Sequence, residues 1–206
     1  MIRLGLLILG ITLSSIAFGQ DLKKLGMNDS IPPIGIEVGQ MAPSFMAVDQ
    51  DGITVDMESK LKDGPIVLIF YRGAWCPYCV KYLLNVTDSL DQIESAGASI
   101  YAVTPQLIEG VKNVSNKTEG AIRILHDKDG AIMGAYDGDF VVTEDYQKRV
   151  NSKKMDLAKS NGQSEAKLPV PATYVINAKG EIVFRHFDYD YKNRASVKAI
   201  LAALDR

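Results

Sequence analysis

Cysteine is scarce in this chain: Cys76 and Cys79 are the two among 206 residues. Two cysteines are too few for the disulfide scaffolds that stabilise many small secreted domains. Charge is also nearly balanced, at a formal net value of −2, so the composition gives no basic surface for nucleic acid or an anionic membrane. Internal repeats are lacking too, and the length suits one well-buried domain preceded by a short leader.

Long apolar runs are lacking as well, apart from one at the start of the chain. Residues 1–3 are a short basic start, residues 4–18 are strongly apolar, and Ala17-Phe18-Gly19 offers small residues at cleavage-type positions. This pattern predicts a signal peptide at 1–19. An uncleaved membrane anchor is the alternative, but the run is rather short to span a bilayer. We therefore expect an exported protein, periplasmic or secreted, that leaves the membrane after cleavage.

The segment after the leader shows little periodicity. Residues 20–36 contain Pro32-Pro33 and are predicted to form a tether that leads into one domain at 37–206. Near the start of that domain, Asp51-Gly52 lies between two stretches of alternating apolar residues. Such a turn signal predicts a β-hairpin.

Both cysteines follow the strongest strand signal of the chain. Residues Ile66–Phe70 form an unbroken apolar run, which is typical of a strand buried on both faces. Gly73 breaks this run, and Pro77 suits the first position of a helix because its missing N–H needs no partner there. Apolar residues then recur at helical spacing from Leu83 to Ile93. The sequence thus predicts a strand, a short turn and a helix, with Cys76 at the start of the helix.

This placement predicts a redox-active dithiol. The thiolate is the attacking species in thiol chemistry, and a helix N-terminus lowers the pKa of a thiol. With two residues between them, the sulfurs can pair without unfolding the chain, so we interpret Cys76 as the nucleophile and Cys79 as the resolving thiol. A structural disulfide is one alternative, although so small a loop restricts the unfolded chain little. A zinc half-site is another, but it lacks a second cysteine pair, and His126 and His186 lie far along the chain. We expect neither a metal nor a cofactor.

The rest of the domain is predicted to alternate between strands and helices. Strands are predicted at 98–103, 122–125, 174–176 and 182–187, and helices at 107–116, 143–159 and 194–204. Strands alternating with helices indicate a wound α/β sheet.

Two segments carry a resemblance to a known family. Phe70–Cys79, Phe-Tyr-Arg-Gly-Ala-Trp-Cys-Pro-Tyr-Cys, resembles the active-site segment of peroxiredoxin-like proteins in the alkyl hydroperoxide reductase/thiol-specific antioxidant (AhpC/TSA) superfamily. Residues 39–45, Gly-Gln-Met-Ala-Pro-Ser-Phe, resemble the N-terminal segment of peroxiredoxins and of periplasmic thioredoxin-like reductases, and the likeness to the family covers Glu37 to Leu204. It implies a thioredoxin-like α/β fold, with a central mixed sheet flanked by helices and an N-terminal hairpin extension.

The resemblance also suggests roles for three residues near the cysteines. In thioredoxin folds a cis-proline opens the strand that faces the cysteine pair, and Pro171 matches that position best, with Pro169 as the rival. A cis bond there would leave room for a substrate beside the sulfur; an ordinary trans proline at the first residue of a strand is the alternative. Arg72 is expected either to stabilise the Cys76 thiolate or to be a surface cation. Trp75 is expected to shield the sulfur.

The implied activity is reduction of hydroperoxides. Cys76 would attack the peroxide, Cys79 would resolve the sulfenic acid to a disulfide, and a thioredoxin-like or other thiol donor would reduce it. Typical peroxiredoxins carry a proline, a Thr or Ser, and an arginine at the positions held here by Ile69, Gly73 and Pro171. Two alternatives therefore stay open: a thioredoxin-like thiol-disulfide oxidoreductase acting on protein disulfides, and a non-catalytic binding module.

Overall fold

The computed structural model describes residues 22–27, 31–151 and 154–205, so the signal peptide predicted at 1–19 lies outside the described residues. The strands are β1 (Met46–Asp49), β2 (Thr54–Asp56), β3 (Ile66–Phe70), β4 (Ser99–Thr104), β5 (Arg123–His126), β6 (Asp139–Val141), β7 (Lys167–Pro169), β8 (Ala172–Ile176) and β9 (Ile182–Phe187). The helices are α2 (Met57–Leu61), α3 (Pro77–Thr87), α4 (Leu90–Ser95), α5 (Ile108–Lys117), the 3-10 turn η1 (Lys128–Gly130), α6 (Ala131–Ala135), α7 (Glu144–Asn151), α8 (Leu157–Asn161) and α9 (Val197–Leu204). Within these ranges, no helix has both the length and the apolar character needed to cross a membrane.

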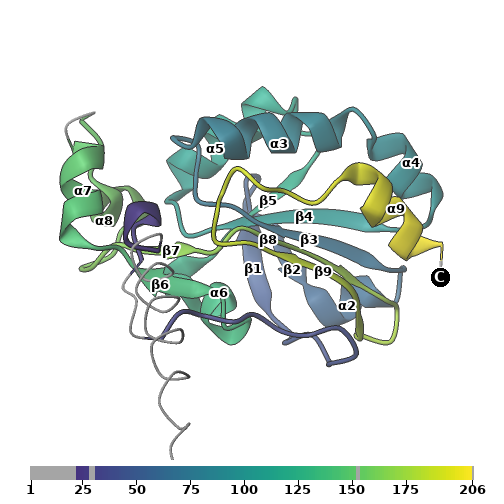
Figure 1. Ribbon diagram of the computed structural model, residues 1–206. Coiled ribbons are helices and arrows are strands. Elements are labelled where there is room, and N and C mark those ends of the chain that lie inside the picture. The colour runs from purple at the N-terminus through teal and green to yellow at the C-terminus, as the bar shows by residue number, and fades with distance from the viewer. Residues whose placement is uncertain (1–21, 28–30, 152–153, 206) are drawn as a thin grey trace, which may run out of the picture.

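Seven strands form one mixed sheet in the order β2-β1-β5-β4-β3-β8-β9. Strand β3 lies in the interior of the sheet: it runs parallel to β4 and antiparallel to β8. Helices cover both faces of this sheet (Figure 1), with α3, α4, α5 and α9 on one side and α2 and α6 on the other. The predicted α/β architecture with a mixed sheet flanked by helices is confirmed.

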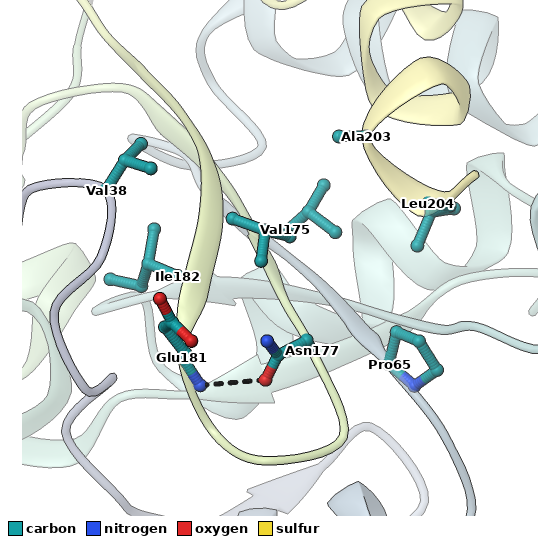
Figure 2. Close-up of a pocket in the computed structure, with 9 residues that line it drawn as sticks. Val38, Pro65, Val175, Asn177, Glu181, Ile182, Ala203 and Leu204 are labelled. Carbon is teal, nitrogen blue, oxygen red and sulfur yellow. Dashed lines mark hydrogen bonds between the residues drawn. The ribbon is translucent and has the colours of Figure 1, made fainter. Parts of the chain in front are cut away.

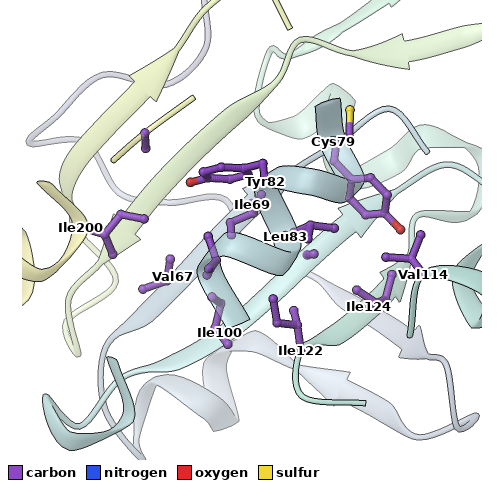
Figure 3. Packing of buried hydrophobic residues seen from close by; sticks show 14 of the residues in the cluster. Val67, Ile69, Cys79, Tyr82, Leu83, Ile100, Val114, Ile122, Ile124 and Ile200 are labelled. Atoms are coloured by element: carbon purple, nitrogen blue, oxygen red, sulfur yellow. The ribbon is translucent and has the colours of Figure 1, made fainter. Parts of the chain in front are cut away.

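The alternation along β3 explains the two layers. Val67 and Ile69 point into one buried cluster with α3, α4, α5 and α9, whereas Leu68 and Phe70 point into a second cluster with α2 and α6. Successive side chains of a strand face opposite sides, so a central strand covered on both sides must be apolar throughout. Figure 3 shows side chains of α3, including Tyr82 and Leu83, packed among the strand residues of the first cluster.

The strand pair predicted about Asp51-Gly52 is present and adds two strands to one edge of the main sheet. β1 and β2 are antiparallel, with Val48 opposite Thr54. β1 also pairs with β5, where Val48 lies opposite His126. Both strands therefore belong to the central sheet, because β1 joins it by backbone hydrogen bonds.

Two predicted helices are each divided in the structure. The apolar spacing from Leu83 to Ile93 spans α3 and α4, which are separated at Asp88 and Ser89. The helix predicted at 143–159 is α7 followed by α8, and the side chain of Asp156 begins the second by accepting a hydrogen bond from the Lys159 N–H at 3.0 Å. A side-chain cap of this kind starts a new helix and does not continue an old one.

A small unit that the sequence did not reveal lies beside the main sheet. β6 and β7 form a separate two-stranded sheet, and α7 and α8 lie between them in sequence (Figure 1). We call this unit, from β6 to β7, the insertion. A third buried cluster joins this insertion to the start of the described chain: Leu22 and Met27 are 2% and 1% exposed and pack in it. The prediction that 20–36 is a tether is therefore wrong for residues 22–27, which are part of the folded unit.

Candidate active site

The loop from β3 to α3 places Cys76 at the first turn of a helix. Cys76 has extended backbone angles and is the N-cap of α3, and Pro77 follows as the first helical residue, as predicted. The Cys76 Sγ accepts a hydrogen bond from the Cys79 N–H at 3.4 Å. The sulfur therefore lies at the positive end of the helix, where negative charge is stabilised.

The two sulfurs are joined in a disulfide. The Cα atoms of Cys76 and Cys79 are 5.3 Å apart, and both side chains are 0% exposed. The predicted pairing is thus present. Because both sulfurs are buried, a reductant reaches them only after a local rearrangement of the covering side chains.

Arg72 is buried beside this disulfide. Its side chain is 4% exposed, and its Nη2 lies 3.8 Å from the Cys76 Sγ. Its Nη1 donates a hydrogen bond to the Tyr146 hydroxyl at 2.8 Å, and its guanidinium carbon lies 3.6 Å from the centroid of the Tyr191 ring. The alternative that Arg72 is a surface cation is therefore wrong. Burial lowers the pKa of Arg72, and Tyr146 and Tyr191 act in the opposite direction, but a guanidinium in a protein stays charged.

Trp75 packs at the junction of two buried clusters. It lies against the cluster around the cysteines and against the one formed by the insertion. The guanidinium carbon of Arg72 is 5.0 Å from its ring centroid. The expected shielding of the sulfur by Trp75 stays a prediction, which this packing supports.

Gln106 holds the cysteine loop in place, a role that the sequence did not suggest. Its Oε1 accepts a hydrogen bond from the Ala74 N–H, and its Nε2 donates to the Ser160 Oγ at 2.7 Å. The side chain fits because Gly73 and Gly110 have no Cβ, which would lie 2.7 and 2.8 Å from it. The φ of +145° at Gly73 also favours glycine.

The prediction of a cis bond at Pro171 is wrong. No cis peptide bond occurs in the described parts of the chain, and the rival Pro169 lies in β7. Val170 and Pro171 connect β7 to β8 without a turn, and the Val170 N–H donates to the Gly138 carbonyl at 2.7 Å. A connection without a tight turn does not require a cis bond. Pro171 still immediately precedes β8, the neighbour of β3, and its suggested part in substrate docking stays a prediction.

A second arginine lies close to the site and was missed. Arg194, in the segment before α9, donates from Nη2 to the Phe70 carbonyl at 3.2 Å, and its guanidinium carbon lies 4.5 Å from the Tyr82 ring centroid. Burial lowers the pKa of Arg194 to about 10; Tyr82 opposes that change, and the charge of Arg72 adds to it. The nearby Tyr82 hydroxyl is 3.2 Å from the Thr173 Oγ1.

Three buried N–H donors on Arg72, Trp75 and Arg194 have no acceptor in the described part of the chain. Among the described residues, Arg72 Nε, Trp75 Nε1 and Arg194 Nη1 are buried without a hydrogen-bond partner. An unpaired buried donor is costly, so each of these groups is open to donate a hydrogen bond to a water or a ligand oxygen.

The two histidines lie elsewhere. His126 is in β5, where burial lowers its pKa, and His186 lies opposite Thr173 on β9. In the described ranges, no hydrogen bond joins either histidine to Cys76, and no three His, Cys, Asp or Glu side chains are grouped as metal ligands.

Two openings differ in their relation to the cysteines. A groove of about 710 Å³ between α5 and α8 reaches Ala74, two residues before Cys76. A pocket of about 350 Å³ (Figure 2) is lined by Pro65, Val175 and Leu204, with Glu181 hydrogen-bonded to Asn177 at its edge. Pro65 precedes β3 and Cys76 follows it, so the pocket lies at the opposite end of that strand and is separate from the redox site.

A thioredoxin-like α/β domain with a Cys-x-x-Cys pair at the start of a helix defines a class of thiol redox proteins. Comparison with known families refines this class. The AhpC/TSA family matches residues 38–185, and the chain belongs to that family.

Individual relatives are more distant. Chloroplastic peroxiredoxin Q of Populus jackii is 31% identical over 97 residues, which are 47% of this chain and 45% of that protein. Peroxiredoxin Bcp of Escherichia coli is 24% identical over 94 residues, 46% of this chain and 60% of that protein. The chain thus matches about half the length of such curated relatives. The crystal structure of peroxidoxin BcpB from Mycobacterium tuberculosis has a TM-score of 0.63 at 19% identity, covering 82% of this chain and 97% of that one, which shows a shared fold.

Proposed function

We propose that this chain is a peroxiredoxin-like thiol peroxidase in which Cys76 reduces a hydroperoxide and Cys79 resolves the product. The observation that carries the proposal is the buried guanidinium of Arg72, with Nη2 3.8 Å from the Cys76 Sγ. A fixed cation there favours the thiolate and stabilises the charge that develops on a peroxide oxygen. Membership of the AhpC/TSA family and the names of the curated relatives support the same activity.

The proposed reaction has three steps. The Cys76 thiolate attacks one oxygen of the hydroperoxide, the O–O bond breaks, the departing oxygen takes a proton to leave as an alcohol, and Cys76 becomes a sulfenic acid. The Cys79 thiol attacks the sulfenic sulfur, the disulfide forms and water leaves. A thioredoxin-like protein or another thiol donor then reduces the disulfide and is itself oxidised to a disulfide.

Arg72 supplies the positive charge that the sequence lacks at the usual peroxiredoxin position. The position of the peroxide-orienting arginine of typical peroxiredoxins is held here by Pro171. The structure has a cation beside the sulfur nevertheless, because Arg72 comes from the cysteine loop itself. The charge that the reaction requires therefore has a source within the motif.

Stopped-flow oxidation of the reduced protein tests this proposal. Addition of a hydroperoxide is expected to convert the Cys76–Cys79 pair to the disulfide rapidly, with one peroxide consumed per pair. Cys76→Ser is expected to abolish consumption, and Cys79→Ser to consume one equivalent and stop at the sulfenic acid. Slow oxidation of the intact pair by peroxide contradicts the peroxidase proposal.

Disulfide exchange is the second candidate, favoured by the close Cys-x-x-Cys geometry at the start of α3. The same reduced protein mixed with an oxidised protein substrate distinguishes the two. Faster oxidation by the protein disulfide than by peroxide supports the oxidoreductase. Oxidation by neither supports a binding module.

We also propose that the chain is exported, on the basis of its apolar start and the small residues at 17–19. The mature protein recovered from expressing cells is expected to begin at Gln20 and to be found outside the cytoplasm. Intact-mass measurement checks the first point, and recovery of uncleaved protein contradicts it.

A further inference from the structure

The insertion contributes a side chain to the redox site. Tyr146 lies in α7, and its hydroxyl accepts the hydrogen bond from Arg72 Nη1 at 2.8 Å. The other terminal nitrogen of the same guanidinium, Nη2, is the atom that faces the Cys76 sulfur. A guanidinium is planar and rigid, so fixing one nitrogen also fixes the direction of the other.

The Tyr146 ring is held by groups other than Arg72. A Cβ at Gly26 would lie 2.7 Å from this ring, so the N-terminal segment packs directly against it, and φ is +96° at Gly26. The Thr143 N–H donates to the Gly26 carbonyl at 2.9 Å, and the Arg149 guanidinium carbon lies 5.0 Å from the ring centroid. The ring therefore has anchors other than Arg72.

We propose that Tyr146 is a positioning residue for Cys76: from the insertion, its hydroxyl holds Arg72 so that the guanidinium faces the sulfur. The hydroxyl and the arginine that it holds come from positions 74 residues apart in the sequence. The role of Tyr146 in turnover rests on the proposed peroxidase function, but its effect on the Cys76 thiol does not.

The decisive measurement is the pKa of the Cys76 thiol, followed by thiolate absorbance against pH. Cys79→Ser serves as the parent, so that Cys76 is the single thiol. Tyr146→Phe keeps the ring and removes the hydroxyl, and the Cys76 pKa is expected to rise by about one unit, roughly a tenfold loss of thiolate where the thiol form dominates. Tyr136→Phe is the matched control, because it removes a buried hydroxyl on the other face of the sheet, and it is expected to leave the pKa unchanged.

An unchanged Cys76 pKa in folded Tyr146→Phe overturns the proposal. Circular dichroism establishes folding, and Gly26→Ala gives a second variant that displaces the ring while keeping the hydroxyl. It is expected to raise the pKa in the same direction, and no rise in this folded variant also counts against the proposal. A raised pKa in a protein inactive toward peroxide refutes the proposed function alone, whereas an active parent with an unshifted Tyr146→Phe variant refutes this inference alone.

Discussion

Aromatic rings surround the charge of Arg72, and no carboxylate from the described parts of the chain pairs with it. Its guanidinium carbon lies 3.6 Å from the Tyr191 centroid and 5.0 Å from that of Trp75, and no ion pair to Arg72 occurs within the described residues. Ring faces attract a cation without neutralising it. Among the described residues, the guanidinium charge beside the Cys76 sulfur is therefore not offset by an ion pair.

Replacement of Arg72 tests this charge. Arg72→Gln is expected to raise the pKa of the Cys76 thiol by about one to three units, because the nearby positive charge is lost. The rate constant with peroxide is expected to fall about 100-fold or more, as when one stabilising donor is removed from a developing oxyanion. Thiolate absorbance and stopped-flow oxidation measure the two effects.

Two further variants separate charge from geometry. Arg72→Lys keeps the charge but lacks the planar fork that reaches both Tyr146 and the sulfur, so an intermediate effect is expected. Arg185→Lys is the control. Arg185 forms an ion pair with Glu37, with an N–O distance of 3.6 Å, and this pair does not involve the cysteines. Equal behaviour of Arg72→Gln and the parent contradicts the role assigned to Arg72.

The parts of the site within one short segment were predictable, and the parts brought in from elsewhere were not. Cys76, Cys79 and Arg72 are all in the loop and first turn after β3, and local turn chemistry placed them. Gln106 reaches Ala74 from 32 residues away, and Tyr146 reaches Arg72 from 74. Neither polar residue carries a local signal, because its partner is chosen by tertiary packing.

The boundaries of helices and strands were also only partly predictable from the sequence. Apolar spacing correctly marked Leu83 and Ile93 as buried, yet the helix stops between them, because periodicity reports which side chains face the core and not whether backbone hydrogen bonds are continuous. Asp156 before Leu157 is an N-cap signal that the sequence does contain. The three-residue strands β6 and β7 are too short for any alternation to be recognised.

The start of α6 depends on a buried carboxylate. Asp127 is 1% exposed, and its two oxygens accept hydrogen bonds from the Ile132 and Met133 N–H groups, each at 2.8 Å. Burial raises the pKa of Asp127 to about 6, although these two hydrogen bonds act to lower it. The folded protein thus binds a proton at this group more tightly than the unfolded chain does.

Stability is therefore expected to depend on pH through Asp127. A carboxyl with a raised folded-state pKa contributes stability that is full below the unfolded value of about 4 and is lost as pH rises through about 6. Raising the pH from about 5 to about 7.5 is therefore expected to remove roughly 1–2 kcal/mol of this group's contribution to the free energy of unfolding. Urea unfolding at the two pH values measures the change.

Asp127→Asn isolates this contribution. The variant is expected to be less stable overall, because an amide matches two N–H donors poorly, but its loss of stability between the two pH values should be smaller than that of the parent. Asp91→Asn, which alters an exposed carboxylate in α4, should keep the parent's dependence. An identical pH dependence in Asp127→Asn and the parent contradicts the assignment.

At the scale of the whole molecule, the N-terminal segment, the insertion and the cysteine loop form one packed unit. Leu22 and Met27 are buried in the third cluster with Tyr146, and Trp75 packs on the edge of that cluster. The Met27 backbone bridges to Val142, next to β6. The chain before the main sheet therefore supports the same side chain that positions Arg72.

Truncation of Met27 tests this arrangement at a distance from the cysteines. Met27→Ala is expected to lower the free energy of unfolding by about 2–5 kcal/mol, because it opens a cavity in a buried cluster. Ile31→Ala provides the control four residues away: Ile31 is 90% exposed, against 1% for Met27, so its loss is expected to change stability by less than about 0.5 kcal/mol. Urea unfolding compares the two variants with the parent. If the residues before the domain were a free tether, neither substitution would change the free energy of unfolding. If they are a folded segment, only Met27→Ala lowers it.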